Sequence, residues 1–125
     1  MADNANCSCS TAPKLIFACS GGSDVGKISD DAARLLTKEG KGKMFCLAGI
    51  GGRVSGIMAS TETAAKILAI DGCPLDCTKK TLELAGFKSF EHLRLSDLGL
   101  QKGKSGPTEE NSRLVADAGA EKLSC

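Results

Sequence analysis

The chain has 125 residues, of which 42% are hydrophobic and 25% are charged, and this size and composition predict one globular domain. Sixteen Lys and Arg residues nearly balance fifteen Asp and Glu residues, and the chain has no Trp, no Tyr and four Phe. The charge balance argues against a protein that binds nucleic acid or a membrane surface through its charge. The scarcity of aromatic rings argues against a protein that binds bases by stacking.

Four short apolar runs, each closed by a turn-forming segment, predict the strands of a sheet. In chain order the predicted strands are Leu15–Cys19, Met44–Ala48, Lys66–Asp71 and Phe90–Leu95. Between and after them, helix-start residues, apolar stripes and glycines that end helices predict four helices. These run from Ser23 or Asp24 to about Lys38, from Val54 to about Ala65, from Leu75 to Ala85, and from a first turn containing Pro107 through a buried stripe of Leu114, Val115, Ala118 and Leu123.

Strand and helix therefore alternate along the chain. A helix that connects two strands returns the second strand in the same direction, so the alternation predicts a parallel sheet. We expect an α/β fold: a single three-layer domain with a mainly parallel four-stranded sheet and helices on both faces, of the Rossmann or flavodoxin-like type. The domain is predicted to span residues 14–125, after a flexible Cys-containing arm at residues 1–13.

Seven cysteines are the unusual feature of the composition. The N-terminal region lacks the basic and apolar parts of an export signal, and no apolar run approaches the roughly 20 residues of a membrane span, so we expect a cytoplasmic protein. An odd cysteine count in a reducing compartment argues against a disulfide framework. Such thiols indicate metal binding or redox chemistry, and the alternative is that they are buried as small hydrophobic side chains.

Three of the cysteines fall at predicted strand ends. Cys19 closes the first strand, Cys46 lies near the end of the second, and Cys73 lies two residues past the third. The carboxyl ends of parallel strands share one edge of the sheet, and open α/β sheets build their binding sites at that edge. The sequence therefore predicts that thiols distant in the chain converge there, which cysteines used only as filler have no reason to do.

Cys77 extends this pattern. Pro74 suits the first position of a helix, which predicts Cys73 as the N-cap residue and Cys77 one turn further on. Helical side chains lean toward the N-terminus, so the sulfur of Cys77 is expected to point back toward Cys73. Four converging thiolates suit tetrahedral Zn²⁺. From the residues alone three interpretations stay open: a metal site, a reactive or redox thiol, and inert burial.

Two other motifs nearly match known sites and are set aside. Residues 21–27 are close to a phosphate-binding loop between a strand and a helix, but Ile28 stands where a hydroxyl would hold Mg²⁺. Ser29 comes one position late and would be rotated by about 100° around the helix. A phosphatase loop has the Cys-x5-Arg pattern, whereas six residues separate Cys46 from Arg53. We therefore interpret the glycines as residues that allow a tight turn.

Four blocks of the sequence resemble, in order, those of the DGC-domain family: CSGGSDVGKISDDAARLL, CLAGIGG, IDGCPLDCTKKTLELAG and HLRLSDLG. The family consists of small prokaryotic proteins described as zinc-binding and named for an Asp-Gly-Cys motif, here Asp71-Gly72-Cys73. The resemblance covers roughly residues 15–102. The zinc ligands that it implies are Cys19, Cys46, Cys73 and Cys77. The cysteines outside these blocks are Cys7, Cys9 and Cys125. The resemblance implies no reaction, because no biochemical activity is established for the family.

Five residues beside the cysteines are expected to shape the loops of the site or to bond its ligands: Ser20, Ser23, Asp71, Gly72 and Asp97. Ser20 and Ser23 either donate hydrogen bonds to sulfur or to an anion, or cap the turn and the helix. Asp71 is expected to accept backbone N–H bonds or to touch a ligand, and Asp97 to orient a ligand or to serve as a turn residue. His92, the one histidine, is expected at the opposite end of its strand from the cysteines and outside the site.

The first functional hypothesis is a binding protein that holds Zn²⁺ through the four cysteines, for metal handling or as a metal-stabilised scaffold. A closed four-sulfur site is usually structural, which disfavours hydrolysis at the metal. The alternative is a thiol redox protein or reductase, in which Cys73 or Cys77 attacks as a thiolate and Cys19 or Cys46 resolves the intermediate as a disulfide. A third hypothesis is an interaction module whose site only stabilises the fold. Whether the chain is an enzyme, which protein it contacts and whether the outer cysteines join the site are left open.

Overall fold

The computed structural model describes residues 12–124. The predictions about the N-terminal arm, with Cys7 and Cys9, and about Cys125 fall outside the described residues. Within them the chain forms a four-stranded sheet, in the order β2-β1-β3-β4, in which every neighbouring pair of strands is parallel. The strands are β1 (Lys14–Ala18), β2 (Lys43–Met44), β3 (Lys66–Asp71) and β4 (Glu91–Arg94). The predicted α/β class with a parallel sheet is confirmed.

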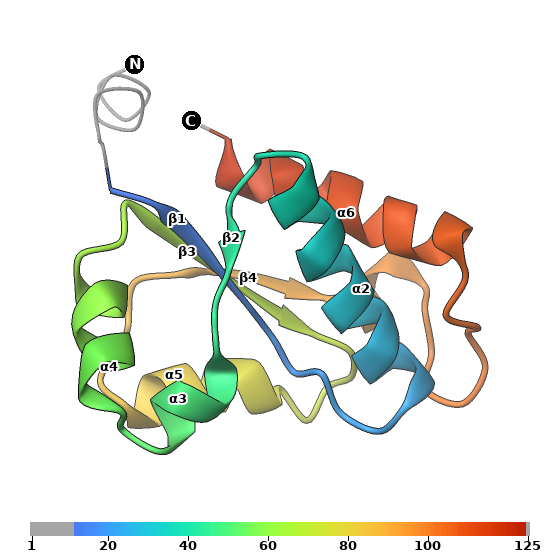
Figure 1. Ribbon diagram of the computed structural model, residues 1–125. Coiled ribbons are helices and arrows are strands. Elements are labelled where there is room, and N and C mark those ends of the chain that lie inside the picture. The colour runs from blue at the N-terminus through green and yellow to red at the C-terminus, as the bar shows by residue number, and fades with distance from the viewer. Residues whose placement is uncertain (1–11, 125) are drawn as a thin grey trace.

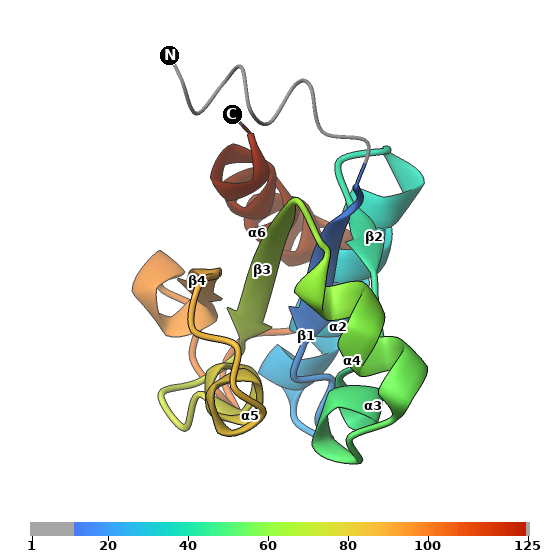
Figure 2. The same cartoon turned by 90° about the vertical axis from the view of Figure 1, so that its left-hand side faces the viewer.

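Helices cover both faces of this sheet (Figure 1, Figure 2). The helices on one face are α2 (Asp24–Lys38) and α6 (Glu109–Leu123). Those on the other face are α3 (Leu47–Gly51), α4 (Ser55–Glu62) and α5 (Cys77–Leu84). A short 3₁₀ helix, η1 (Leu95–Leu98), follows β4. Among the described residues, no helix has the length and apolar character needed to span a membrane.

The central strands are apolar on both faces, which explains why their sequences are continuous apolar runs. In β1, Ile16 and Ala18 pack with α2 and α6, whereas Leu15 and Phe17 pack with α3, α4 and α5. Successive side chains of a strand point to opposite faces, so this one strand contributes to both cores. The sheet is therefore the middle of three layers, and both helical layers border its carboxyl edge.

The prediction of a strand over Met44–Ala48 is wrong in its extent. β2 ends at Met44, and α3 begins at Leu47. The Sγ atom of Cys46 accepts a hydrogen bond from the backbone N–H of Gly49 (3.3 Å) and caps α3. A short apolar run fits a buried strand and a buried helix equally well by its periodicity, and here Leu47 and Ile50 reach the core from a helix.

The last helix differs from the prediction at its start and on one face. Its N-cap residue is Thr108, so Pro107 precedes the helix rather than lying in its first turn. Val115 and Leu123 are buried as predicted, but Leu114 is 45% exposed. The buried face of the helix is centred on Val115, Ala116 and Gly119, and Leu114 lies outside it.

Candidate functional site

The four cysteines that the sequence singles out all follow the carboxyl ends of strands or begin the helix after one, so they lie at the carboxyl edge of the sheet. Cys19 follows β1 directly, Cys46 lies two residues past β2, Cys73 lies two residues past β3, and Cys77 is the first residue of α5. The backbone N–H of Cys19 donates to the carbonyl of Ile70 (3.1 Å), which joins the ends of the two central strands. All four are free thiols, with Cys46 and Cys77 exposed. The topology thus brings thiols that are distant in the sequence to one edge.

The four sulfur atoms do not form a closed metal cage in this structure. Within residues 12–124, no three of them lie within 4.8 Å of one another. A tetrahedral site with Zn–S bonds of about 2.3 Å holds its sulfur atoms about 3.8 Å apart. The residues therefore suit zinc in donor type and in their place on the fold, while their sulfur atoms stand too far apart to bind one ion together. Zinc binding by these cysteines stays a prediction.

The predicted helix start at Cys73 and Pro74 is wrong. α5 begins at Cys77, and its N-cap residue is Asp76, whose φ of 55° lies in the left-handed region. The chain first makes a turn, in which the Asp76 N–H donates to the Cys73 carbonyl (3.2 Å). Cys73 and Cys77 therefore belong to a turn and to a helix, and the expected alignment of their sulfur atoms along one helix does not apply.

Asp71 provides the cap that starts α5. Its side chain is 1% exposed and accepts hydrogen bonds from the backbone N–H groups of Thr78 (2.7 Å) and Lys79 (3.1 Å). The N-cap residue Asp76 makes no side-chain cap bond, so Asp71 takes over that role from the end of β3. The Thr78 hydroxyl in turn donates to the Ile70 carbonyl (3.1 Å). These bonds fix the first turn of α5 against the end of β3.

Gly72 lets the loop after β3 lie against the start of α2. A Cβ atom at this position would stand 2.8 Å from the Cγ2 atom of Val25 and 2.9 Å from its backbone carbonyl carbon. Val25 is buried and cannot move aside freely. The Asp-Gly-Cys motif therefore has a structural meaning: the acid caps α5, the glycine packs on α2, and Cys73 follows at the edge.

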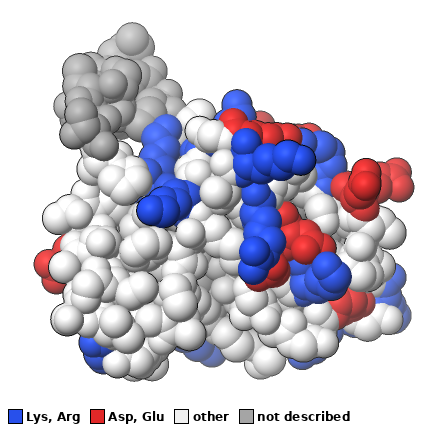
Figure 3. Space-filling model, in the orientation of Figure 1, with Lys and Arg blue, Asp and Glu red and all other residues white. Residues whose placement is uncertain are grey.

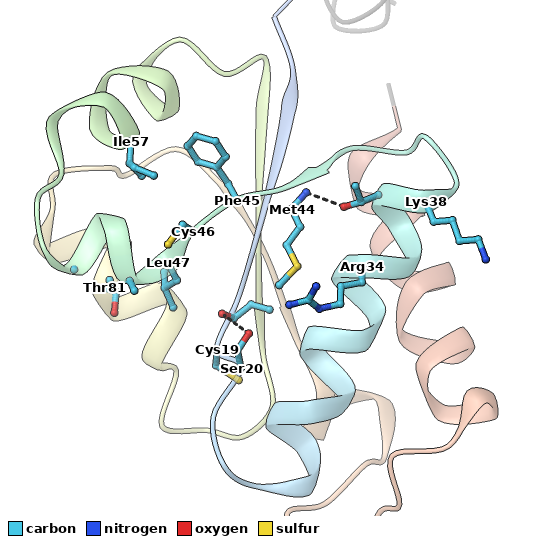
Figure 4. A pocket seen from close by; sticks show the side chains of 14 residues that line it. Cys19, Ser20, Arg34, Lys38, Met44, Phe45, Cys46, Leu47, Ile57 and Thr81 are labelled. Atoms are coloured by element: carbon cyan, nitrogen blue, oxygen red, sulfur yellow. Dashed lines mark hydrogen bonds between the residues drawn. The ribbon is translucent and has the colours of Figure 1, made fainter.

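A cleft of about 1130 Å³ opens at the same edge, between α2 and the segment formed by β2, α3 and α4 (Figure 4). We call it the α2 cleft; Cys19, Cys46, Phe45, Leu47 and Ile57 are among its lining residues. Two thiols can therefore meet one small molecule there. The sequence pointed to the thiols but not to the cleft, because its walls come from separate segments and no local motif marks such a surface.

Most of the chain matches a known family. Residues 15–118 match the DGC domain. The chain belongs to the DGC domain family. Over 105 residues it is 36% identical to the anaerobic and virulence modulator AnvM of Pseudomonas aeruginosa, a match that covers 82% of this chain and 80% of that protein. No solved structure matches the sequence. The resemblance that the four sequence blocks indicate is confirmed.

Beside the Asp-Gly-Cys motif of this DGC domain, side chains from β4 form a polar network with acidic side chains at the end of β3 and just before α5. The Nε2 atom of His92 lies 2.9 Å from Asp71 Oδ2 and 3.7 Å from Asp76 Oδ1. Arg94 donates to both oxygens of Asp76, from Nε (2.8 Å) and from Nη2 (2.5 Å). The expected position of His92, away from this edge, is wrong because β4 pairs with the second half of β3, with His92 opposite Ala69. The three residues His92, Asp71 and Asp76 hold potential metal-ligand atoms within 4.8 Å of one another, but each already has a protein partner.

The ion pair in this network predicts a pH dependence of stability. The Arg94 guanidinium holds the pKa of Asp76 below its ordinary value of 3.8, chiefly through its hydrogen bonds. A carboxyl whose pKa is lowered by folding stabilises the folded state above the unfolded pKa, and the effect is lost as the pH falls through the folded pKa. We expect Arg94→Gln to lower the free energy of unfolding at pH 7. Below about pH 4 this free energy should fall less steeply with pH in the variant than in the wild type.

Urea unfolding followed by circular dichroism over this pH range measures the effect. Lys102→Gln removes one positive charge from an exposed loop and serves as the matched control. A pH dependence of Arg94→Gln that coincides with those of the wild type and the control would show that this pair does not govern acid stability.

The other residues expected to support the site have partners of their own. Ser20 has a φ of 49°, and its hydroxyl donates to Asp30 Oδ1 (2.7 Å). Ser23 caps α2 by accepting an N–H bond from the first turn of that helix. The carboxylate of Asp97, in η1, is 69% exposed and lies 3.9 Å from Arg94. These residues shape turns and helix starts at the edge, and within the described part of the chain they make no recorded bond to a cysteine sulfur.

The glycine-rich segment after β1 is not built as a phosphate cradle. The carboxylate of Asp24 lies at the start of α2 and accepts N–H bonds from Val25 (2.8 Å) and, in the loop before α6, from Gly103 (2.9 Å) and Ser105 (3.2 Å). These bonds, the one from Gly103 foremost, lower the pKa of Asp24. A Cβ atom on Gly26 would stand 2.7 Å from the backbone of the preceding loop. The chain's own carboxylate occupies the helix start where a phosphate group would bind, so this segment serves packing.

Proposed function

We propose that this DGC domain binds Zn²⁺ through its four edge cysteines and acts in metal handling or as a metal-stabilised scaffold. The ligands of the proposal are Cys19, Cys46, Cys73 and Cys77. The observation that carries it is the placement of four free thiols at one edge of the sheet. Thiolate sulfur is the donor that structural zinc sites use most. A bound ion would supply a cross-link between three strand ends and the start of α5.

Binding one ion requires the four sulfur atoms to move closer together. The proposal places this movement in the segments that follow the strands, because Cys73 lies in a turn and Cys19 begins a loop. Loops open and shift at a smaller free-energy cost than core strands. Because a site that closes around a metal couples binding to folding, zinc should raise the stability of the domain.

The relative AnvM is named a modulator, and a binding role is compatible with that name. We extend this to the present chain as part of the proposal. A domain whose loops tighten when a metal ion binds can present two different surfaces to a partner, one in each state. This makes a modulatory role compatible with the arrangement of the thiols.

Metal content tests the proposal directly. Protein purified under reducing conditions without added metal should retain about one zinc ion per chain, and absorption at the zinc edge should report four sulfur neighbours. We expect Cys77→Ser to lower zinc affinity by about tenfold or more and to lower the melting temperature as well. Cys9→Ser, outside the proposed ligand set, is the matched control and should change neither quantity.

Protein that holds no zinc after addition and dialysis would count against zinc binding at this edge. A Cys77→Ser variant with wild-type zinc content would remove Cys77 from the ligand set, and a Cys9→Ser variant that loses as much zinc as Cys77→Ser would contradict a site made by these four cysteines alone. Since each proposed ligand comes from a different segment, the four single Cys→Ser variants together identify which segments contribute.

A second candidate function is thiol redox chemistry, favoured by one observation. Cys19 and Cys46 line the same cleft, and Cys46 is exposed. In that case two thiols lose two protons and two electrons and form a disulfide, while a disulfide-containing oxidant is reduced to two thiols. A count of free thiols before and after treatment with oxidised glutathione, followed by mass spectrometry, separates this function from zinc binding, which shields thiols without oxidising them.

A further inference from the structure

The α2 cleft has a wall chemistry that zinc binding does not explain. Its apolar wall is made by Met44, Phe45, Leu47 and Ile57. Among residues 12–124, the charged residues that line it are Arg34 and Lys38, and none of its lining residues is acidic. In Figure 4 the guanidinium of Arg34 turns into the cleft, whereas the ammonium group of Lys38 points away from it. The cleft therefore combines a broad apolar surface with one inward-facing cation.

The molecular surface around the cleft shows the same division. In Figure 3 the area over α3 and α4 is largely free of charged side chains, whereas charged side chains of both signs, Lys and Arg together with Asp and Glu, gather over α2. The segment from residue 44 to residue 62 carries only Arg53 and Glu62 as charged residues. Arg53 donates to the carbonyls of Ile50 (2.8 Å) and Leu84 (3.1 Å), so its charge is used to tie helix ends together. The apolar side of the cleft thus offers no charge of its own to a ligand.

Arg34 is oriented by its neighbours. Its Nε donates to Asp30 Oδ2 (2.6 Å), and the other oxygen of Asp30 accepts the hydroxyl of Ser20 (2.7 Å). The Arg34 side chain is 69% exposed, and no residue between 12 and 124 accepts a recorded hydrogen bond from its two terminal nitrogens. A guanidinium whose Nε is held in this way presents its remaining donors to solvent, in the geometry that matches a carboxylate.

We propose that the α2 cleft binds an amphipathic organic carboxylate, with its carboxylate on Arg34 and its apolar body against the wall formed by Met44, Phe45, Leu47 and Ile57. The volume of the cleft, about 1130 Å³, lies slightly above the range of roughly 300–1,000 Å³ found for small-ligand pockets, so the cleft has room for such a molecule. A carboxylate can accept hydrogen bonds from the terminal nitrogens of Arg34, which the bond from Nε to Asp30 leaves available, whereas a neutral apolar molecule or a cation cannot. The site needs neither zinc nor a thiol reaction, although Cys19 and Cys46 also line it.

Decanoate is a suitable probe, and two-dimensional ¹H–¹⁵N NMR of the full chain locates it. We expect saturable shifts of the amide signals of residues 44–48 and of Arg34. Decanol, which has the same chain length without the charge, should bind about tenfold more weakly, since a charge-assisted hydrogen bond is lost. The titration is run on zinc-loaded protein and on protein treated with a chelator, so that failure of carboxylate binding and failure of zinc binding are separate results.

Arg34→Gln should weaken decanoate binding about tenfold while leaving decanol binding unchanged. Lys38→Gln is the matched control, because Lys38 lies one turn further along α2 and points away from the cleft, and it should weaken decanoate binding less than about twofold. Arg34→Lys keeps the charge without the forked donors, and its affinity for decanoate should lie between those of the Arg34→Gln and Lys38→Gln variants. A merely structural role of Arg34 would change the affinities for both probes together.

Two results would overturn the proposal. One is an absence of saturable shifts in residues 44–48 with either metal state of the protein. The other is an Arg34→Gln variant that keeps its amide dispersion and binds decanoate as the Lys38→Gln variant does.

Discussion

The Asp71→Ala variant is expected to lose about 3 kcal/mol of its free energy of unfolding. The carboxylate of Asp71 is 1% exposed and accepts two backbone N–H groups of α5, with the ring of His92 beside it. Removing it leaves buried donors without partners, and each such group costs about 1–3 kcal/mol. The chain lacks Trp and Tyr, so urea unfolding is best followed by circular dichroism.

Two companion variants make this expectation specific. Asp71→Asn keeps an acceptor oxygen without the charge and should lose about 1–2 kcal/mol, which preserves the test if the alanine variant does not fold. Asp97→Ala removes a carboxylate that is 69% exposed and should change stability by less than about 0.5 kcal/mol. Hydrogen exchange should show faster exchange of the Thr78 and Lys79 amides in the Asp71 variants. Equal stability of Asp71→Ala and Asp97→Ala would contradict the capping role.

The free energy of unfolding of the Gly72→Ala variant is expected to be lower by about 2 kcal/mol or more, because an added methyl group at a closely packed contact forces the backbone to shift. The added Cβ atom would stand 2.8 Å from Val25 Cγ2 and 2.9 Å from the Val25 carbonyl carbon. One of these atoms belongs to the side chain and the other to the backbone of α2. The double variant with Val25→Ala should therefore recover part of the loss and not all of it.

Gly56→Ala is the matched control for Gly72→Ala. Gly56 lies in α4 and has nothing within 4 Å of the position that a Cβ atom would occupy. Alanine favours a helix over glycine by up to about 1 kcal/mol, so this variant should be as stable as the wild type or more stable. If Gly72→Ala is as well tolerated as Gly56→Ala, the close approach of the β3–α5 loop to α2 is not required by the fold.

The Asp71→Ala and Gly72→Ala variants also test the proposed metal site. Asp71 and Gly72 hold the loop from which Cys73 and Cys77 emerge, without being ligands themselves. If zinc binds at this edge, both variants should bind it more weakly, and added zinc should restore part of their stability. Loss of stability with unchanged zinc affinity would assign Asp71 and Gly72 to the fold alone.

Local patterns determined much of this protein. The apolar run of Lys66–Asp71 has the bounds of β3, and the alternation of strands and helices predicts the parallel sheet. The positions of the cysteines relative to the strand ends place all four at one edge. These features follow from the sequence because periodicity, helix starts and the handedness of crossovers depend on residues that are neighbours in the chain.

Only the tertiary structure decided how that edge is built. The helix after Cys73 begins at Cys77 because Asp71 caps it from seven residues away, and no local propensity records that bond. Likewise, the register of β4 brings His92 to Asp71, and the separation of α2 from the β2–α3–α4 segment at this edge leaves the α2 cleft open. The distances between the four sulfur atoms are likewise set by the tertiary structure. Each depends on contacts between residues far apart in the chain, whose free energies are set by packing and by the satisfaction of buried polar groups.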